Sequence, residues 1–547
     1  MNSFYTYIVV GGGSAGAVVA ATLAKKTINK VLLLEGGYSH KHPLLDMPAG
    51  IFKMINGSKY MHYHQTTPQA HLGGRVHDIP QGNVLGGGSS VNAQVYMRGR
   101  ASDYDEWKTL LGEDSPWGWQ DVLPYFKAME SNNRLLNEYH GNEGPVLVSD
   151  PQHIDASSRD FVQSVQAQGI GFNDDFNGAR QKGVGFYQFT NRNGRRSSTA
   201  YAYLEPSKSP NNLDIQLQSR VEKVLIEKGV AVGVVYKNDS GAIQEARLSE
   251  GGGGEIILAA GALITPKLLM LSGVGGANQL AKHGIKCHVD LPGVGENLID
   301  HPEVPIIATA KKGFGYYKQG EGWRMWLNGL QFALFGTGPV TSAGVEAGAF
   351  VNPSNPQSEA SIQAFCVPMV YLDRDVLNLV KNDYGMTITT VVVKPVSRGY
   401  VRLSSANPDD KALICPNLLK EESDLQAMMA GQRFFINTFQ TPPLAHSIQS
   451  ILLPQLDPVT NDLTDDALEE HCKKTVKTNY HPAGTCRMGK KTDPMAVLND
   501  RLQVRGVQGL RVCDMSAVPN INAGNTNAVA MMLGQRCADF IMHRNDA

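Results

Sequence analysis

Two polar side chains near the C-terminus, His481 and Asn525, have the types that proton transfer to and from a substrate requires. His481 lies in the run NYHPAGTCRMG and Asn525 in the run GNTNA. The unperturbed pKa of histidine is near neutrality, so an imidazole can take a proton from a hydroxyl group. An asparagine amide can donate a hydrogen bond to the resulting oxyanion without titrating. A His-Pro dipeptide alone is more often a turn or a buried structural histidine, so this interpretation depends on the rest of the chain.

The N-terminal segment predicts a nucleotide site that such side chains could face. The apolar run Tyr7 to Val10 is typical of a buried parallel strand, and Gly11, Gly13 and Gly16 follow with G-x-G-x-x-G spacing. Gly11 permits the tight turn, Gly13 lets the backbone approach a pyrophosphate, and Gly16 lets the next helix pack closely. The pyrophosphate is expected at the positive N-terminus of that helix.

An acidic residue completes this unit. The run Lys30 to Leu34 predicts a second strand, and Glu35 follows it about twenty residues beyond the glycines, where the fingerprint needs an acceptor for ribose hydroxyls. A carboxylate repels a 2′-phosphate, so the motif favours FAD or NAD over NADP.

Other segments must position these residues. The glycine-rich stretch 79–92 allows close backbone approach to a ligand. A strand ending at Leu258 is expected to lead into a helix at Thr265-Pro266, which the Thr265 hydroxyl caps and which ends at Gly273. The run Ala528 to His543 predicts a last helix whose N-terminus attracts a negative group.

A different pattern occupies the region 340–420. Thr387 to Val393 and Tyr400 to Leu403, with a turn-rich segment after them, predict antiparallel strands and not a further β-α-β unit. This region is the candidate for a domain that faces the substrate.

Length and composition limit the class of protein. A chain of 547 residues predicts two intertwined domains. The 50 basic and 51 acidic residues leave no basic excess for a nucleic-acid partner. Seven dispersed cysteines predict reduced thiols of an intracellular enzyme. The first strand begins too early for a signal peptide and no apolar run is long enough for a transmembrane segment, so we expect a cytoplasmic protein, with peripheral membrane contact left open.

These motifs together resemble the glucose-methanol-choline (GMC) oxidoreductases. The blocks that carry the resemblance follow the family order over nearly the whole chain: GGGSAG with Glu35, LGGGSSVNAQVYMRGRASDYDEW, GALITPKLLMLSGVG, LPGVGENLIDHP, NYHPAGTCRMG and GNTNA. The resemblance implies oxidation of an alcohol CH–OH group by hydride transfer to N5 of FAD. His481 matches the catalytic histidine, and Asn525 matches the second catalytic position, which is His or Asn among members.

The implied fold is α/β, with a discontinuous Rossmann-type FAD-binding domain and an α+β substrate domain built on an antiparallel sheet. We expect the FAD domain at 1–155, 213–303 and 475–547 and the substrate domain at 156–212 and 304–474. The resemblance assigns FAD contacts to Gly11, Gly13, Ser14, Ala15, Gly16, Glu35, Val84, Gly86, Gly87, Ser90, Asn92, Ala93, Val221, Asp514, Asn525 and Thr526.

Several positions depart from the family pattern. Val91 stands where some members attach FAD through a histidine, so we expect non-covalent FAD. Gln81 and Asn83 replace Arg and Lys. Asn479 replaces a small apolar residue found in several oxidases, which favours a dehydrogenase with an electron acceptor such as a quinone or an artificial dye, although O2 stays open.

Several other polar residues are weaker candidates for a site. His62, His64, His71 and His77 lack a clear ligand pattern, so no metal site is predicted. Glu346 is interpreted as a solvated or hydrogen-bonded glutamate at a strand end, the alternative being a contact to a cationic alcohol. A hydroxynitrile lyase of the same family would carry a second histidine at position 525. A nicotinamide dehydrogenase would share only the N-terminal fingerprint. The alcohol itself and the oligomeric state are not predicted.

Overall fold

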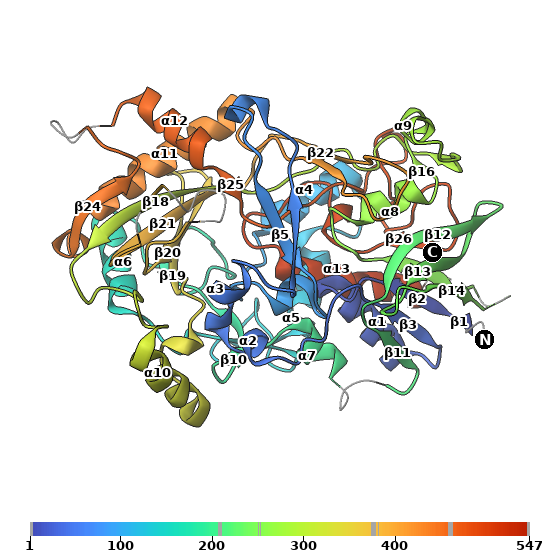
Figure 1. The fold of residues 1–547 in the computed structure, drawn as a ribbon, viewed down its shortest axis with the longest axis horizontal. Coiled ribbons are helices and arrows are strands. Elements are labelled where there is room, and N and C mark those ends of the chain that lie inside the picture. The colour runs from blue at the N-terminus through green and yellow to red at the C-terminus, as the bar shows by residue number, and fades with distance from the viewer. Residues whose placement is uncertain are drawn as a thin grey trace.

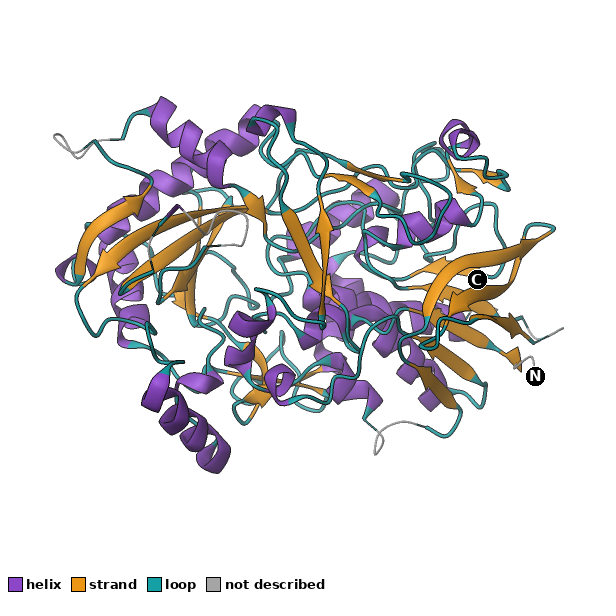
Figure 2. Cartoon of the chain, in the orientation of Figure 1, coloured by secondary structure: helices purple, strands orange, loops and turns teal. Residues whose placement is uncertain are grey.

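The computed structural model describes residues 4–205, 210–249, 251, 253–372, 379–380, 382–457 and 463–543. Two sheet-based halves lie side by side, and both marked termini lie on the right-hand half in Figure 1. Both halves contain strands and helices (Figure 2). Within the described part of the chain, no helix has the length and apolarity needed to cross a bilayer.

The first half is built on a five-stranded parallel sheet with the order β11-β3-β2-β15-β26. The strands are β11 (Leu213–Gln216), β3 (Val31–Leu34), β2 (Tyr7–Val10), β15 (Glu255–Leu258) and β26 (Leu510–Val512). The two predicted N-terminal strands are confirmed, the second starting one residue later than expected. Helix α1 (Ser14–Lys26) packs along α13 (Asn527–Met542), and a Cβ at Gly534 would lie 2.7 Å from Ala15 O, so this glycine permits the close approach.

The second half contains an antiparallel sheet with the order β24-β18-β21-β20-β19-β8, and β25 also pairs with β18. Its strands are β8 (Gly183–Phe186), β18 (Pro302–Ala310), β19 (Ala347–Val351), β20 (Ile362–Val367), β21 (Gly385–Val392), β24 (Ile448–Leu453) and β25 (Lys477–Thr478). Helices α6 (Ala156–Ala167), α11 (Glu422–Phe439) and α12 (Asp465–Thr475) bury apolar side chains against it in one core. The predicted antiparallel strands are confirmed as β21 and as β22 (Tyr400–Arg402), which pairs with β23 (Leu413–Cys415).

The protein is therefore an α/β fold with a Rossmann-type sheet and a second, antiparallel domain. The domain boundaries proposed from the sequence remain a prediction. The other strands are β1 (Phe4–Tyr5), β4 (Met61–Gln65), β5 (Asp78–Gly82), β6 (Glu130–Asn132), β7 (Val146–Ser149), β9 (Phe189–Arg192), β10 (Arg195–Arg196), β12 (Arg220–Glu227), β13 (Val230–Lys237), β14 (Ile243–Leu248), β16 (Val274–Gly275) and β17 (Val289–Asp290). The other helices are α2 (Pro43–Asp46), α3 (Ile51–Met54), α4 (Ala101–Leu111), α5 (Trp119–Met129), α7 (Thr199–Leu204), α8 (Thr265–Leu271), α9 (Ala277–Lys282) and α10 (Gly322–Phe335).

The start of α8 differs from the prediction. Ile264 is the N-cap residue and no side chain caps the helix, so the expectation that the Thr265 hydroxyl would cap it is wrong. Thr265 Oγ1 instead donates to Asp514 Oδ2 at 2.6 Å. Thr265 is the first residue inside the helix and not the N-cap residue, and its hydroxyl donates a hydrogen bond to the buried Asp514 carboxyl group. The helix ends before Gly273, whose φ of 79° matches the expected stop.

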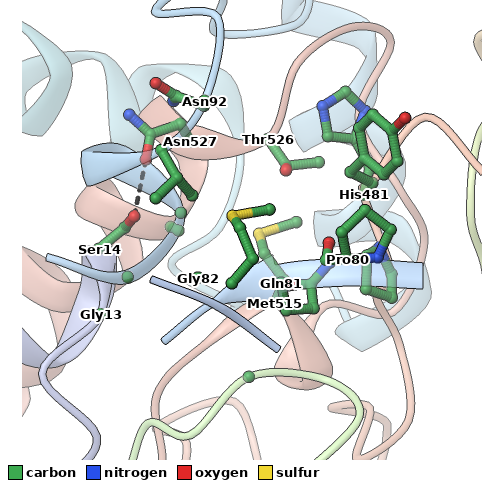
Figure 3. Close-up of a pocket in the computed structure, with 18 of the residues that line it drawn as sticks. Gly13, Ser14, Pro80, Gln81, Gly82, Asn92, His481, Met515, Thr526 and Asn527 are labelled. Atoms are coloured by element: carbon green, nitrogen blue, oxygen red, sulfur yellow. Dashed lines mark hydrogen bonds between the residues drawn. The ribbon is translucent and has the colours of Figure 1, made fainter. Parts of the chain in front are cut away.

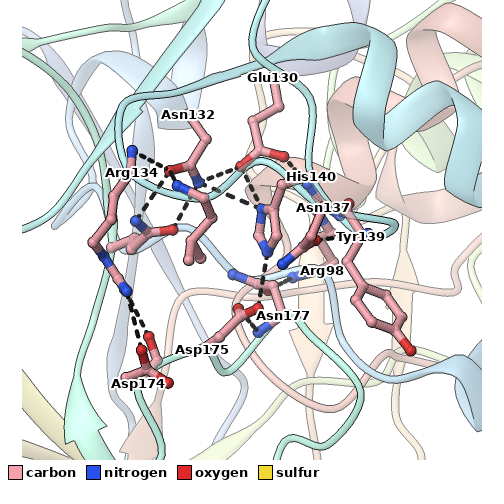
Figure 4. Close-up of polar contacts among 12 residues, drawn as sticks. Arg98, Glu130, Asn132, Arg134, Asn137, Tyr139, His140, Asp174, Asp175 and Asn177 are labelled. Carbon is pink, nitrogen blue, oxygen red and sulfur yellow. Dashed lines mark hydrogen bonds and ion pairs between the residues drawn. The ribbon is translucent and has the colours of Figure 1, made fainter.

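A buried polar network fixes the loop before α4 (Figure 4). The Arg98 guanidinium pairs with the Glu130 carboxylate. His140 Nδ1 lies 2.9 Å from Glu130 Oε1, and its Nε2 lies 3.0 Å from Asp175 Oδ2. Burial by itself lowers the pKa of His140, but the hydrogen bonds to Asp175 and Glu130 outweigh it and raise that pKa. Since breaking a buried ion pair costs about 3–5 kcal/mol, the network holds this loop in one conformation.

Candidate functional site

A cavity of about 500 Å³ is walled by residues of both halves. Figure 3 shows Gly13 and Ser14 at one side of it and His481 at the other. Its lining includes most of the predicted site residues: Gly11, Gly13, Ser14, Ala15, Glu35, Gly87, Asn92, Ala93, Val221, His481, Asp514, Asn525 and Thr526. Gly16, Val84, Gly86 and Ser90 do not line it.

The turn from β2 into α1 forms the nucleotide side of the cavity. Gly11 has φ 100°, and a Cβ there would lie 2.4 Å from Ala259 O. A Cβ at Gly16 would lie 1.9 Å from Gly11 O, so this glycine lets the helix pack against the turn. A Cβ at Gly13 would meet its nearest atoms only at 4.0 Å, which leaves the backbone accessible from the cavity.

Glu35 is buried at the end of β3. Its Oε2 accepts a hydrogen bond from Gly12 N–H and its Oε1 one from Gly37 N–H, both at 2.7 Å. Burial raises the pKa of this carboxyl group, while the two N–H donors oppose the shift. Each carboxylate oxygen keeps a further lone pair for a hydroxyl donor. Val221, at the start of β12, lines the same cavity.

Two helix N-termini meet at this side. Ser14 Oγ, in the first turn of α1, donates to Asn527 Oδ1 at the start of α13 at 2.7 Å (Figure 3). Thr526 is the N-cap residue of α13. The partial positive charges of both helices are therefore concentrated on one wall, an arrangement that suits a phosphate or another anionic group.

The second glycine-rich loop packs against the first. Gly86 N donates to Gly12 O at 2.7 Å, and a Cβ at Gly87 would lie 2.7 Å from Gly13 Cα. Ser90 Oγ donates to Leu85 O at 2.7 Å, which explains why Ser90 faces away from the cavity. Gly86 and Ser90 do not line the cavity, but their hydrogen bonds fix the backbone of this loop.

Arg196 supports the next part of that loop. Its Nη1 donates to Asn92 Oδ1 at 2.7 Å and to Ser89 O at 3.2 Å, and its Nε donates to Leu45 O at 2.9 Å. Burial lowers the pKa of Arg196 to about 9. Asn92 lines the cavity, so the guanidinium fixes a wall residue from behind.

At the other side, His301 determines the tautomer of His481. His301 Nε2 lies 3.0 Å from Val393 O and 3.1 Å from Asn522 O, and because carbonyl oxygens only accept, this nitrogen carries the hydrogen. Burial lowers the pKa of His301 to about 4, so the ring is neutral and its Nδ1 is bare. His481 Nδ1 lies 3.0 Å from this bare nitrogen and is assigned as the donor to it; the Asn479 amide nitrogen also lies 3.4 Å from His481 Nδ1. His481 Nε2 is then left with its lone pair.

The bare Nε2 of His481 lies beside Asn525. Asn525 Nδ2 is 3.5 Å from it, and Asn525 Oδ1 accepts a hydrogen bond from Gln363 Nε2 at 3.2 Å. Gln363 therefore orients the amide so that its NH2 group faces the imidazole. Burial, with smaller contributions from His301 and Lys477, lowers the pKa of His481 well below its usual range. A neutral imidazole acceptor and an amide donor thus share one wall.

Asp300 holds the backbone of this histidine. Its Oδ1 accepts a hydrogen bond from His481 N–H at 3.0 Å, and Thr478 Oγ1 also donates to the carboxylate. Burial raises the pKa of Asp300 to about 7. Tyr480, which lies between Thr478 and His481 in the chain, has φ 63°, a conformation that non-glycine residues rarely adopt. The carboxylate therefore stabilises a tight bend that directs His481 into the cavity.

A carboxylate in the cavity wall is paired with an internal ammonium group. Glu303 on β18 and Lys477 on β25 are opposite each other in the antiparallel pair. Lys477 Nζ lies 3.0 Å from Glu303 Oε2, and both side chains are almost fully buried. Lys477 Nζ also donates to Tyr480 Oη at 3.2 Å. The charge of Glu303 is therefore compensated by the protein itself.

The donor set fits FAD. The Gln94 amide lines the cavity, and neither its nitrogen nor its oxygen has a hydrogen-bond partner in the described structure. Thr389 is also part of the lining, and its Oγ1 has no hydrogen-bond partner in the described structure. Buried polar atoms without partners are rare in proteins, so these groups indicate a polar ligand next to the apolar wall. The glycine turn, Glu35 and the two helix N-termini supply matching contacts for an adenosine diphosphate.

Of the weaker candidates from the sequence, some line the cavity and some do not. Glu346 is not part of the lining; it accepts hydrogen bonds from Ser158, Ser342 and Tyr316, which agrees with its interpretation as a hydrogen-bonded glutamate. His62 and His64 do line the cavity. Among the described residues, no group of three His, Cys, Asp or Glu side chains could hold a metal ion.

Sequence reasoning gave His62, His64 and Thr265 other roles and missed five further residues at this site. The five are Gln94, His301, Glu303, Gln363 and Lys477. The DHPE run at 300–303 offered a signal for two of them, because clustered titratable residues inside a family block indicate a site. Gln363 and Lys477 carry no such local signal.

Comparisons with known proteins agree on one family. A family model described as GMC oxidoreductase matches residues 5–303, and a second with the same description matches residues 395–534. An alcohol dehydrogenase (acceptor) from Pseudomonas putida is 40% identical over 550 residues, covering 99% of this chain and 96% of that protein. The mitochondrial choline dehydrogenase of Mus musculus is 35% identical over 544 residues, covering 98% of this chain and 89% of that protein.

Solved structures give the same result. A pyridoxine 4-oxidase from Mesorbium loti superposes with a TM-score of 0.87 at 27% identity, covering 98% of this chain and 99% of that one. A formate oxidase from Aspergillus oryzae RIB40 superposes with a TM-score of 0.90 at 26% identity, covering 100% of this chain and 99% of that one.

Proposed function

Because the chain belongs to the GMC oxidoreductase family, whose members use FAD, we propose that it oxidises the CH–OH group of a neutral alcohol to an aldehyde or ketone. The observation that carries this proposal is the pairing of a bare His481 Nε2 with the Asn525 amide in the cavity that also receives two helix N-termini. FAD, when bound, supplies the hydride acceptor. Glu35, Asp514 and the first turns of α1 and α13 would hold it.

The protein residues handle the proton. His481 Nε2 takes the hydroxyl proton, and Asn525 Nδ2 donates a hydrogen bond to the alkoxide as negative charge develops. The imidazolium formed keeps its Nδ1–H on His301 Nδ1, a neutral acceptor that stabilises the new positive charge. His301 therefore acts as a positioning residue for the base.

The test is an anaerobic screen of neutral and cationic alcohols against the purified yellow protein. A substrate bleaches the flavin absorbance, and the organic product is identified in the same sample. Turnover with an artificial dye is then compared with oxygen consumption, which identifies the class of electron acceptor. Absence of bleaching by every alcohol tested, with FAD demonstrably bound, would contradict the proposed function.

The compensated carboxylate supports a neutral substrate. A quaternary ammonium group such as that of choline needs a free carboxylate or an aromatic cage. Of the carboxylates in the cavity lining, Glu303 is the one closest in sequence to His301, two residues away. Lys477 already neutralises its charge. A cationic alcohol would meet a carboxylate that is already paired, so Glu303 offers it no uncompensated charge.

We expect Lys477→Met to move specificity toward cationic alcohols. Removal of the ammonium leaves Glu303 uncompensated, so kcat/KM for choline relative to a neutral alcohol rises at least about tenfold, the effect of about 1.4 kcal/mol. The ratio of two substrates on one variant cancels any effect on His481. Lys474→Met, at an exposed position of α12, is the matched control. An unchanged ratio above neutral pH would exclude this role for the pair.

FAD is expected to leave the denatured protein. Val91 lines the cavity at the position where a covalent link would need a nucleophilic side chain, and an isopropyl group has none. Acid or heat precipitation should therefore release all the flavin into the supernatant, where its absorbance is measured. Flavin that stays with the precipitated polypeptide would refute a non-covalent site.

A further inference from the structure

The helix α10 presents an apolar face that nothing in the described structure covers. Trp323, Trp326, Leu327, Leu330 and Leu334 follow helical spacing and are between 55% and 75% exposed. Phe332 is the one buried residue of this helix. In Figure 1 the helix projects from the lower left of the molecule, away from both halves. A contiguous exposed stripe of this kind marks an interaction surface.

Both ends of the stripe are fixed to the body. The Cζ atom of Arg195 lies over the Phe332 ring, 4.8 Å from the ring centroid. Gly336 ends the helix in the left-handed conformation, with φ 62°. Before the helix, Tyr316 donates to the buried Glu346. These contacts therefore hold the helix in place with its apolar side outward.

The charge around the helix identifies the kind of partner. Residues 311–338 contain four basic side chains, Lys311, Lys312, Lys318 and Arg324, and one acidic side chain, Glu321, giving a local net charge of +3 in a chain of net charge −1. The three lysines are exposed. Tryptophan beside leucine on one face, with basic residues at the flank, is the composition of helices that lie in the plane of a membrane interface.

We propose that α10 docks this protein onto an anionic lipid surface. At 1.5 Å per residue the helix is about 21 Å long, too short to span a hydrocarbon core of about 30 Å, so it lies in the interface. An anionic lipid surface matches the positive flank, and its interface accommodates tryptophan side chains beside leucine.

The test measures flotation of the FAD-loaded protein with vesicles of phosphatidylcholine, with and without phosphatidylglycerol. The parent protein should float with the anionic vesicles. Trp326→Glu/Leu330→Glu should lower the partition coefficient at least about tenfold, because two buried apolar contacts are lost. Lys312→Glu/Lys318→Glu should weaken binding to anionic vesicles about fivefold per lysine and leave the weak binding to phosphatidylcholine nearly unchanged.

The matched control is Ile28→Glu, at a 98% exposed apolar residue in the turn between α1 and β3. All variants should retain flavin and turnover with a soluble dye, since the substituted side chains are exposed and lie outside the cavity lining. Equal flotation of the parent and the Trp326→Glu/Leu330→Glu variant would overturn the proposal. So would a parent that stays unbound, or a dimer that this variant dissociates. Binding needs no turnover, so this test is independent of the proposed reaction.

Discussion

Replacing His481 with Ala will slow anaerobic reduction of the bound flavin about 10²–10⁴-fold at saturating alcohol, the usual range for loss of a general base. The side chain accepts the hydroxyl proton through Nε2, and no second bare imidazole nitrogen lies beside Asn525 in the described structure. Folding and flavin content should be retained, because the backbone hydrogen bond from His481 N–H to Asp300 does not depend on the side chain.

The parent rate should depend on pH in one direction. Burial lowers the pKa of His481 well below its usual range, so the imidazole is the free base at neutral pH. The reduction rate should therefore show no loss from protonation of His481 near its unperturbed pKa of about 6.5, and should fall only at lower pH, where acid protonates Nε2. Stopped-flow absorbance across pH measures both effects. His283→Ala, at the C-cap of α9, is the control, and an His481→Ala rate equal to that of the parent would remove this residue from the mechanism.

The second large effect is expected at Asn525. Asn525→Ala should reduce the flavin reduction rate about 10²–10³-fold, the range for removal of one oxyanion donor, and should preserve the pH dependence that His481 confers. Asn525→Asp should be at least as slow, because a carboxylate repels the alkoxide.

The Asp variant also carries a distinct signature. A carboxylate in place of an amide that lies 3.5 Å from His481 Nε2 favours the imidazolium, so the inflection of the rate should move to higher pH. Asn437→Asp, at an exposed position of α11 outside the cavity lining, controls for the added charge. An Asn525→Asp variant as fast as the parent would contradict the hydrogen-bonding role. Loss of the pH dependence in Asn525→Ala would mean that the two roles are exchanged.

The nucleotide side could be predicted because its information is local. Gly11, Gly13 and Glu35 belong to one strand-turn-helix-strand unit, in which residue spacing alone fixes the geometry. The structure places all three in the cavity lining. The error at Thr265 came from the same local reasoning, since the acceptor that takes its hydroxyl, Asp514, is 249 residues away.

The sequence by itself therefore determined the dinucleotide motif and the antiparallel strands, because these follow from periodicity and short spaced motifs. The resemblance of its ordered blocks to the GMC family implied the fold class and the two side chains that could handle a proton. Tertiary structure alone decided the tautomer of His481, which depends on His301 180 residues away, and the neutralisation of Glu303 by Lys477 across two strands. It also decided that the apolar side of α10 faces outward. A hydrogen bond, a charge pair or an exposed face is set by which surfaces meet after folding, and no spacing along the chain records that.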